Sequence, residues 1–453
     1  MLIILVSMLQ YYILFNLKSF SPIRLVGNKI ILPIPQNYKQ LRWKIDYNGA
    51  YAEDNLRKYC NLTHCNIETL FHGKQTVHFL LDNKEVSKFS YTTNNGRFLC
   101  YGDSWKRRIC RFSDICFDNG TLTFLAPYSM KAELPFLTIG ARPPPYDQKK
   151  DRQEIFNFNI SKRSRSLSRK YFENTTIYTS VFHNSHMMWH ALYDLILPLF
   201  HTMIFFGIQD SNPEVIVTHH GGKIPNSNYK KIAHSFVNSM YFVKTEACYR
   251  DLIVGITKNK EEDGIKYQFP FNFTHFLVPK LYKHFGINPE RSEQPKVLII
   301  NRKETRKIVN SKQLIEKMKN LFPKFLFIEL YLEDLTIGQQ ISEISTCDVL
   351  IGAHGSGLSH LAWMKSGKTV IEVFPYRFDC KDWYERACNV SGVNYFGYHP
   401  LNSNESFNVT EKEELCWMKE KRCEGSCHDR LRDQDININI SRFINLTNKI
   451  FQR

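Results

Sequence analysis

Several familiar sequence motifs are missing from this chain. The glycine-rich turn GAHGSG at residues 352–357 has neither the G-x-G-x-x-G spacing of dinucleotide-binding domains nor the form of a Walker loop. No internal repeat occurs, which excludes a repeat architecture. The formal net charge is +16, but no DNA- or RNA-binding motif accompanies the densest basic cluster, at residues 162–170. We therefore interpret that cluster as a solvated linker and expect no nucleic-acid partner.

The N-terminal segment has few polar residues and no clear cleavage motif. Leu2 to Leu17 is apolar except for Ser7, Gln10 and Asn16. This run is shorter than the roughly 20 residues that cross a membrane as a helix, and it lacks a small-x-small cleavage site. Residues 1–18 are therefore either a signal anchor, which would attach the protein to a membrane, or a cleaved signal peptide. The basic residues that follow argue, by the positive-inside rule, against a lumenal body.

Ten Asn-x-Ser/Thr acceptors outweigh that argument. Chance would supply roughly four in a chain of this composition, so the excess favours a glycosylated lumenal protein. We expect a protein of the endoplasmic reticulum or Golgi lumen, either a type II membrane protein or a secreted one. The acceptors are Asn61, Asn119, Asn159, Asn174, Asn272, Asn389, Asn404, Asn408, Asn439 and Asn445.

Most of the twelve cysteines fall into close groups, as local disulfides do in an oxidising compartment. The groups are Cys60 and Cys65; Cys100, Cys110 and Cys116; Cys380 and Cys388; and Cys416, Cys423 and Cys427. The last group with His428 leaves zinc ligation as an alternative, although its spacing fits no standard zinc site. Cys347, beside a predicted buried strand, and Cys248 are interpreted as reduced core residues.

With 453 residues, 43% of them hydrophobic, the chain can form two or three packed domains. Residues 19–176 are predicted to be β-rich and irregular, because short apolar pieces alternate with polar turns and cysteines. From residue 177 predicted strands alternate with predicted helices, which indicates doubly wound α/β domains over 177–294 and 295–430. Residues 431–453 form a C-terminal tail.

Residues 348–375 predict a strand, a glycine turn, a helix and a second strand. Three glycines in the turn let backbone amides approach a ligand closely. In an open α/β sheet such a turn lies at the carboxyl end of a strand and favours an anionic group such as a diphosphate. A tight connection without a ligand is the alternative. His354 in the turn and Glu372 in the second strand favour a binding site, unless Glu372 is a strand-end carboxylate that faces solvent.

Arg302 and Arg306 follow another predicted buried strand, at residues 296–300. A helix is predicted next, over residues 310–320, with Asn310 as its cap. Because the carboxyl ends of parallel strands meet at one edge of a sheet, both guanidinium groups and the glycine amides are expected to hold one diphosphate. The alternative is a pair of surface arginines that bind nearby glutamates.

His190 and Asp194 lie four residues apart in an apolar, helix-like segment, residues 187–200. In a regular helix that spacing places both on one face. A carboxylate can then orient an imidazole that accepts a proton, as a general base must do near neutral pH. The alternative is a helix cap and a core histidine.

Taken together, these motifs resemble glycosyltransferase family 61. They are NRKETRKIVN at 301–310, GAHGSGLSHL at 352–361 and VIEVFP at 370–375, preceded by the His-x-x-x-Asp helix that ends in LPLF. The resemblance covers about residues 177–446, including a tail segment RDQDIN at 432–437. That family includes xylosyltransferases and N-acetylglucosaminyltransferases.

The resemblance implies a GT-B-like α/β fold of two facing Rossmann-like domains, here with a β-rich N-terminal region. It also implies inversion at the anomeric carbon without a metal or other cofactor. A nucleotide-sugar donor, a UDP-sugar, is expected on the C-terminal domain and a glycoprotein acceptor on the N-terminal one. GlcNAc is the first expected sugar and xylose the second, on a glycan or a Ser/Thr-linked acceptor. An inactive, lectin-like glycan-binding protein is the alternative.

The resemblance also assigns site residues by motif position. Arg302 and Arg306 are assigned to the diphosphate, and Glu372 to the donor hydroxyls. His190 and Asp194 are the candidates for the base. The nucleotide contacts are His354, Gly355, Ser356, Gly357 and Leu358.

Two expectations concern segments on either side of these motifs. His183 and His186, in the loop before the His-x-x-x-Asp helix, are alternatives for the base. A tail helix with Phe443, Leu446 and Ile450 at helical spacing is expected to pack back on the first domain.

Overall fold

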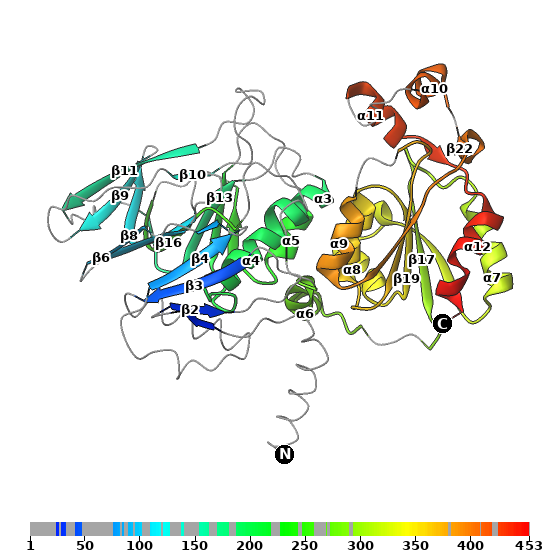
Figure 1. Cartoon of the computed structure of the whole chain (residues 1–453). Helices are drawn as coiled ribbons and strands as arrows, with labels where there is room; N and C mark the ends of the chain where they lie inside the picture. Colours follow the sequence, from blue (N-terminus) through cyan, green and yellow to red (C-terminus); the bar gives the residue numbers. More distant parts are fainter. Residues whose placement is uncertain are drawn as a thin grey trace, which may run out of the picture. The chain divides into compact units, whose positions relative to one another are not determined.

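The computed structural model describes the strands between residues 24 and 162 and most of the chain from residue 170 onward (Figure 1). The chain divides into two compact units. Unit 1 comprises Met1–Ser185, Tyr193–Pro225 and Phe236–Pro270, and unit 2 comprises His186–Leu192, Asn226–Ser235 and Phe271–Arg453. The described ranges after residue 162 are 170–180, 187–218, 227–242, 247–257, 269, 272–289, 293–378, 382–407, 409–418 and 425–452.

The described strands of unit 1 form two sheets. The smaller is antiparallel in the order β1-β2-β3-β4-β5, and the larger runs β10-β11-β9-β8-β16-β13-β14-β15, with β6–β7 beside β8 and β12 beside β16. Among the helical elements, η1 (Leu192–Ile196) leads into α4 (Leu197–Phe205). The strands are β1 Arg24–Val26, β2 Lys29–Leu32, β3 Leu41–Tyr47, β4 Thr76–Leu81, β5 Lys84–Glu85, β6 Phe89–Thr93, β7 Gly96–Tyr101, β8 Ile109–Asp118, β9 Thr121–Ala126, β10 Leu137–Ile139, β11 Glu154–Lys162, β12 Tyr171–Phe172, β13 Thr176–Ser180, β14 Glu214–Thr218, β15 Ser239–Tyr241 and β16 Ala247–Val254.

The parallel part of the larger sheet has the strand order of a doubly wound fold. β13 pairs in parallel with β14 and with β16, and β14 pairs in parallel with β15. Numbered along the chain, the order is 3-2-1-4, as in one half of a Rossmann fold. β8 pairs antiparallel with β16, so strands from the predicted β-rich region continue the same sheet. The boundary predicted between residues 176 and 177 therefore falls within one sheet.

A disulfide joins the two parts of this sheet. Cys116 of β8 and Cys248 of β16 lie directly opposite each other and are bonded, although 132 residues separate them in the chain. The prediction that Cys248 is a reduced core residue is therefore wrong, and the bridge is not local. Spacing in the chain did not reveal this pair, because strand pairing brings the two cysteines together.

Unit 2 is built on a parallel sheet in the order β18-β17-β19-β20-β21. The core strands are buried on both faces, which explains their nearly continuous apolar sequences. The predicted strands at 296–300, 325–330 and 369–374 are confirmed with shifts of one residue. The strands of unit 2 are β17 Lys296–Asn301, β18 Leu326–Tyr331, β19 Val349–Ala353, β20 Thr369–Val373, β21 Asn394–Tyr398, and the short pair β22 Ser406–Phe407 and β23 Asp435–Ile436.

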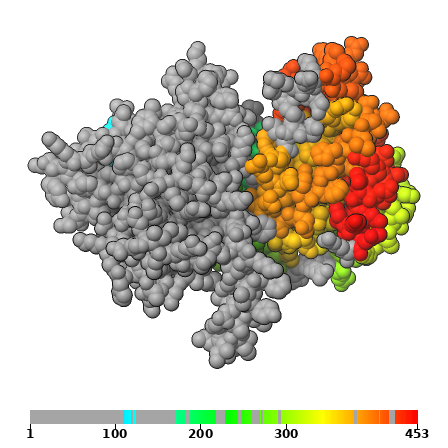
Figure 2. Space-filling view, viewed as in Figure 1, coloured from blue at the N-terminus to red at the C-terminus, as the bar shows by residue number. Residues whose placement is uncertain are grey.

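Helices cover both faces of this sheet. α7 and α12 lie side by side on one face, in yellow-green and red, and their atoms are neighbours in the space-filling view (Figure 2). α6, α8, α9 and η4 pack together on the other face (Figure 1). Helical elements of unit 2 are α3 Met188–Ala191, α5 Ser227–Ala233, α6 Thr274–Phe285, α7 Ser311–Leu321, η3 Leu332–Asp334, α8 Ile337–Ser345, η4 Ser356–Trp363, α9 Trp383–Ser391, η5 Ser403–Glu405, α10 Glu411–Trp417, α11 Gly425–Arg432 and α12 Ile440–Phe451.

The predicted tail helix exists but packs within unit 2. Phe443 is fully buried in the core that also contains Leu314 of α7, and Ile450 packs against that core. Phe451 stacks on Phe322 with 5.1 Å between ring centroids, whereas Leu446 is 46% exposed. The prediction that this helix packs on the first domain is wrong, because its apolar stripe is buried against the α7 face of the unit 2 sheet.

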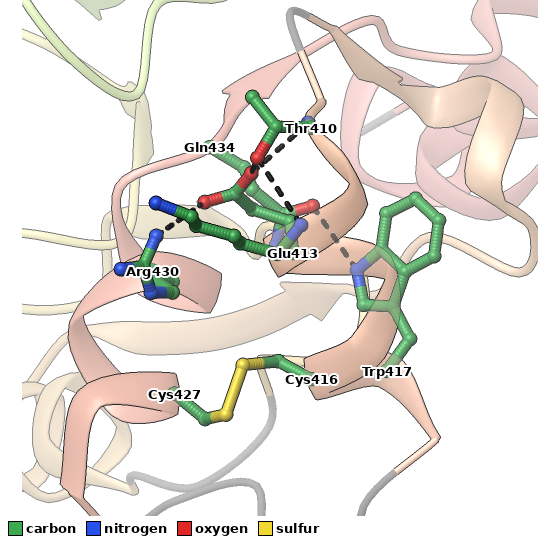
Figure 3. The surroundings of a disulfide bond; sticks show 8 residues. Thr410, Glu413, Cys416, Trp417, Cys427, Arg430 and Gln434 are labelled. Atoms are coloured by element: carbon green, nitrogen blue, oxygen red, sulfur yellow. Dashed lines mark hydrogen bonds and ion pairs between the residues drawn. A yellow bond between two sulfur atoms is a disulfide. The ribbon is translucent and has the colours of Figure 1, made fainter.

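A second disulfide ties α10 to α11. Cys416 and Cys427 are bonded, as the close spacing predicts, and this bond excludes the zinc alternative for their thiolates (Figure 3). At the start of α10 the Thr410 and Glu413 side chains form a reciprocal cap. Arg430 of α11 approaches Glu413 at 3.5 Å. The two short helices are thus fixed to each other by one covalent bond and one ion pair.

Two further cysteines of unit 2, Cys347 and Cys388, lie within the described residues. Cys347 is buried and free, as predicted. Cys388 is also buried and free, so the disulfide expected in its group is not formed; Cys380 lies outside the described residues. Burial raises the pKa of Cys347 to about 12, which keeps that thiol protonated.

No helix within the described part of the chain is both long and apolar enough to cross a membrane. The predicted signal segment, residues 1–18, lies outside the described residues.

Candidate functional site

The predicted site residues lie at the carboxyl edge of the unit 2 sheet. Counted along the chain, its strand order is 2-1-3-4-5, so the order reverses between β17 and β19. In doubly wound sheets a ligand binds in the crevice at such a switch point, beyond the carboxyl ends of the two strands. Arg302 follows β17 and His354 follows β19. The two predicted turns therefore flank the position at which this fold binds ligands.

Asn301, the last residue of β17, shapes the loop that carries the arginines. Its Oδ1 accepts hydrogen bonds from the backbone amides of Arg302 and Ile308, both at 2.9 Å. Its Nδ2 donates to Glu329 Oε1 at 2.6 Å. The two ends of the loop are thus fastened to one buried amide. Sequence analysis did not single out Asn301, although it opens the NRKETRKIVN motif.

The loop directs both guanidinium groups at the glycine turn. Arg306 Nη1 donates to the carbonyl oxygen of His354 at 3.1 Å, and Arg302 Nε donates to the carbonyl of Thr305 at 2.8 Å. A Cβ added to Gly355 would lie 2.6 Å from Nη1 of Arg306 and 2.9 Å from Nη1 of Arg302. The predicted meeting of arginines and glycine turn is therefore present, and only glycine leaves room for it.

Both the backbone conformation and the charge of Arg306 are unfavourable in this arrangement. Arg306 adopts φ +61°, which is uncommon outside glycine. Burial and, next, the positive charge of Arg302 lower the pKa of Arg306 to about 10, although Asp433 opposes that effect. Two converging cations with restricted access to water favour an anion that can contact both, such as a diphosphate. The two arginines do not pair with nearby glutamates, which was the alternative. Arg302 binds Thr305, and Arg306 binds His354 and Asp433.

The rest of the glycine turn forms a 3₁₀ helix, η4, beginning three residues earlier than the predicted helix. Leu358 is turned inward, since its side chain is buried and a Cβ on Gly352 would lie 3.0 Å from it. Its amide donates to the carbonyl of Gly355 at 2.9 Å. Of the assigned nucleotide contacts, Leu358 therefore supports the turn, whereas Gly355 meets the arginines directly.

His354 and Glu372 form a buried pair. Nδ1 of His354 lies 2.5 Å from Oε1 of Glu372, and Tyr395 donates its hydroxyl to Oε2 at 2.7 Å. Glu372 is fully buried and His354 nearly so. Glu372 is thus not a strand-end carboxylate facing solvent; it orients the imidazole, and Tyr395 was missed because only the sheet brings β21 beside β20.

Aromatic rings enclose His354 and connect it to the helix of His190. The centroids of Phe378 and Tyr384 lie 5.0 and 5.3 Å from that of His354. Trp189 of α3 stacks on Trp383 at 5.3 Å and meets Tyr384 at 5.0 Å. The residue before His190 is therefore anchored in the cluster that holds His354.

The two candidates for the base are both buried, with 6% of His190 and 2% of Asp194 exposed. His190 lies in α3, but residues 192–196, which include Asp194, form a π-helix. The regular spacing that would place them on one face is therefore interrupted. π-Helical turns are rare and frequently occur at functional sites. His183 and His186 lie outside the described residues.

Comparison with known proteins matches residues 188–371 to the family model Glycosyltransferase 61. Beta-1,2-xylosyltransferase XYXT1 of Oryza sativa subsp. japonica is 25% identical over 138 residues, which cover 28% of this chain and 29% of that protein. Protein O-linked-mannose beta-1,4-N-acetylglucosaminyltransferase 2 of Mus musculus is 23% identical over 309 residues, or 61% of this chain and 52% of that protein. Alpha-1,3-arabinosyltransferase XAT2 of Oryza sativa subsp. japonica is 25% identical over 154 residues, 31% and 25% of the two chains. The matched regions thus span about half of the mouse relative and less than a third of the rice ones.

Proposed function

Because residues 188–371 match the Glycosyltransferase 61 family model, we propose that the chain is an inverting glycosyltransferase that uses a UDP-sugar. The acceptor is a glycoprotein glycan or a Ser/Thr-linked sugar in the lumen of the endoplasmic reticulum or Golgi. Relatives named for transfer of N-acetylglucosamine, xylose and arabinose support the reaction class. We propose GlcNAc first and xylose second as the sugar.

In this proposal unit 2 is the donor domain and unit 1 contributes the acceptor side of a GT-B-like arrangement. The diphosphate lies at the switch point, where Arg302, Arg306 and the amides from Gly355 to Gly357 contact it. Ser356 and His354 complete the nucleotide side of the site. Glu372 acts on the donor through His354, whose orientation it fixes.

The reaction is a direct displacement. The acceptor hydroxyl oxygen attacks the anomeric carbon, the bond from that carbon to the diphosphate breaks, and its electron pair stays on UDP. A base removes the acceptor proton; His190, with Asp194, holds this role in the proposal. The arginines stabilise the charge that develops on the leaving diphosphate, a role that cations held in place before the reaction perform well. Because the two guanidinium groups supply this charge, the mechanism requires no metal.

One observation carries the proposal: Arg302 and Arg306 converge on Gly355 at the switch point of the sheet. Titration calorimetry with UDP tests it. Arg306→Ala should weaken UDP binding by about 10- to 100-fold, the effect of losing one charge-assisted hydrogen bond. Lys303→Ala is the matched control, because Lys303 lies in the same loop, is half-exposed and pairs with Asp334. Near wild-type UDP release by both Arg306→Ala and His354→Ala would contradict the proposal.

The sugar is identified separately by a panel of UDP-GlcNAc, UDP-xylose and UDP-arabinose, with an O-mannosyl peptide and an N-glycan as acceptors. Transfer of sugar from one of these donors to an acceptor would identify the donor specificity of the enzyme. Binding of glycan without binding of UDP would instead identify a lectin-like protein.

A further inference from the structure

Asp433, directly after α11, contacts two arginines with different roles. Arg432 donates to both carboxylate oxygens, from Nε to Oδ1 at 2.9 Å and from Nη2 to Oδ2 at 2.7 Å. Oδ1 also lies 3.4 Å from Nε of Arg306. One arginine therefore holds the carboxylate, and the carboxylate faces the other.

Asp433 contacts the guanidinium group of Arg306 at its Nε edge. Nε, next to the aliphatic part of the side chain, faces Asp433, whereas Nη1 donates to His354 and approaches Gly355. A guanidinium group is planar and rigid, so a carboxylate at the Nε edge fixes the direction of the terminal nitrogens. Asp433 thus leaves those nitrogens facing the glycine turn.

The segment after Asp433 also holds the backbone beside Arg306. Asp435 Oδ1 accepts from the amide of Lys307 at 2.9 Å. The amide of Ile436 donates to the carbonyl of Lys307 at 2.7 Å, and the amide of Val309 donates to the carbonyl of Ile436 at 2.9 Å. Backbone and side chain of the arginine loop are therefore both positioned by the same downstream segment.

We propose that Asp433 is a positioning residue for diphosphate binding, which acts by directing the terminal nitrogens of Arg306 toward the diphosphate beside Gly355. The inference rests on the proposed function and extends it, since Asp433 itself touches no substrate. Although burial by itself raises the pKa of Asp433, the hydrogen bonds from Arg432 and the charges of Arg432 and Arg306 hold that pKa below its usual value. The carboxylate is therefore ionised at neutral pH.

A positioning role and a purely electrostatic role predict opposite results. If Asp433 were only a counter-charge, its removal would raise affinity for the more highly charged ligand. Its side chain is 34% exposed and shared with Arg432, so solvent and salt screen its charge. The ion pair between Asp433 Oδ1 and Arg306 Nε, at 3.4 Å, is a short-range contact at one edge of a rigid, planar group. The loss of orientation should therefore outweigh the change in charge.

The experiment compares UDP with UMP, which lacks the second phosphate. Dissociation constants of both nucleotides are measured by calorimetry on the full chain for wild type, Asp433→Asn and Asp429→Asn. Asp429 pairs with the same Arg432 at 3.0 Å but is 66% exposed, and its substitution changes the charge equally. We expect Asp433→Asn to reduce the preference for UDP over UMP at least threefold, and Asp429→Asn to leave it unchanged.

A double-variant cycle shows whether the effect passes through Arg306. Adding Asp433→Asn to Arg306→Lys should reduce the UDP preference by less than a further 1.5-fold, since contacting residues are not additive. The inference is overturned if Asp433→Asn leaves the preference unchanged or raises it, or if the two substitutions multiply. Failure of the wild type to bind UDP would instead overturn the proposed function, so the two failures are distinguishable.

Discussion

Nδ1 of His354 lies 2.5 Å from Oε1 of Glu372, whose side chain is fully buried in the unit 2 sheet. The imidazole is thereby held in one orientation at the end of β19. Glu372→Gln keeps the shape but leaves one amide oxygen to serve both His354 and Tyr395, so we expect turnover to fall about 10- to 100-fold, a loss of about 1.4–3 kcal/mol. Affinity for UDP should fall as well, because Glu372 orients His354 on the nucleotide side of the proposed site.

Tyr395→Phe is the comparison, because it removes only the hydroxyl that donates to Oε2 at 2.7 Å. It should reduce turnover less than Glu372→Gln does. Steady-state kinetics of the two variants checks this order, and equal turnover in wild type and Glu372→Gln would refute the role given to the pair.

Gly355→Ala should abolish the approach of the arginines to the turn. The new Cβ would lie 2.6 Å from Nη1 of Arg306 at a backbone φ of +155°, so the arginine must move. We expect UDP affinity to fall at least about tenfold. Gly286→Ala is the control, since Gly286 has φ +64° with open space around it; it should cost about 1 kcal/mol of stability without affecting UDP.

Removing the Cys416–Cys427 bond should destabilise α10 and α11. Closing a loop of this length stabilises a fold by about 2–3 kcal/mol, and the sequence separation is 11 residues. The double variant Cys416→Ala/Cys427→Ala should unfold at lower temperature and be cleaved sooner by protease between α10 and α11. An unchanged melting temperature and cleavage rate would show that the ion pair between Glu413 and Arg430 suffices.

Acid should weaken the fold through buried histidines. Burial lowers the pKa of His360 to about 4, and Trp363 donates to its Nδ1 at 3.1 Å. The unfolded chain therefore binds a proton below about pH 6.5 that the folded chain binds only near pH 4. Stability present above pH 6.5 is lost as the pH falls toward 4, by about 2 kcal/mol for this residue between pH 7 and 5.

Urea unfolding at pH 7 and pH 5 measures this effect. His360→Gln should be less stable than wild type at pH 7 but should lose about 2 kcal/mol less on acidification. The same pH dependence in both proteins would mean that His360 is not the titrating group.

The unit 2 fold can be predicted from the sequence because the pattern of apolar and polar residues within each short segment determines its strands and helices. Apolar runs such as 296–300 and 369–374 alternate with amphipathic segments, and parallel strands necessarily end at one edge. That logic alone places Arg302 and Arg306 beside the glycine turn, and the structure agrees.

The wrong predictions concern contacts between residues that lie far apart in the sequence. Asn310 occupies the predicted cap position of α7, but its side chain pairs with the backbone of Ile438 instead, 128 residues away. Cys248 reaches Cys116 only through strand pairing. The apolar stripe of the tail helix shows that one face is buried, but it does not show which domain buries it; the helix packs in the unit 2 core. Asp433 lay inside the quoted RDQDIN motif, yet only the structure shows which arginine it faces.

The pairing of Lys307 with Asp435 and Ile436 has a consequence for biosynthesis. A ribosome that has just completed the loop with both arginines must still add more than a hundred residues before their partners emerge. During that interval the nascent protein has the cations but not the framework that orients them. Competence to hold a diphosphate therefore arises late in synthesis, only after the segment that follows α11 has been made and has paired with the arginine loop.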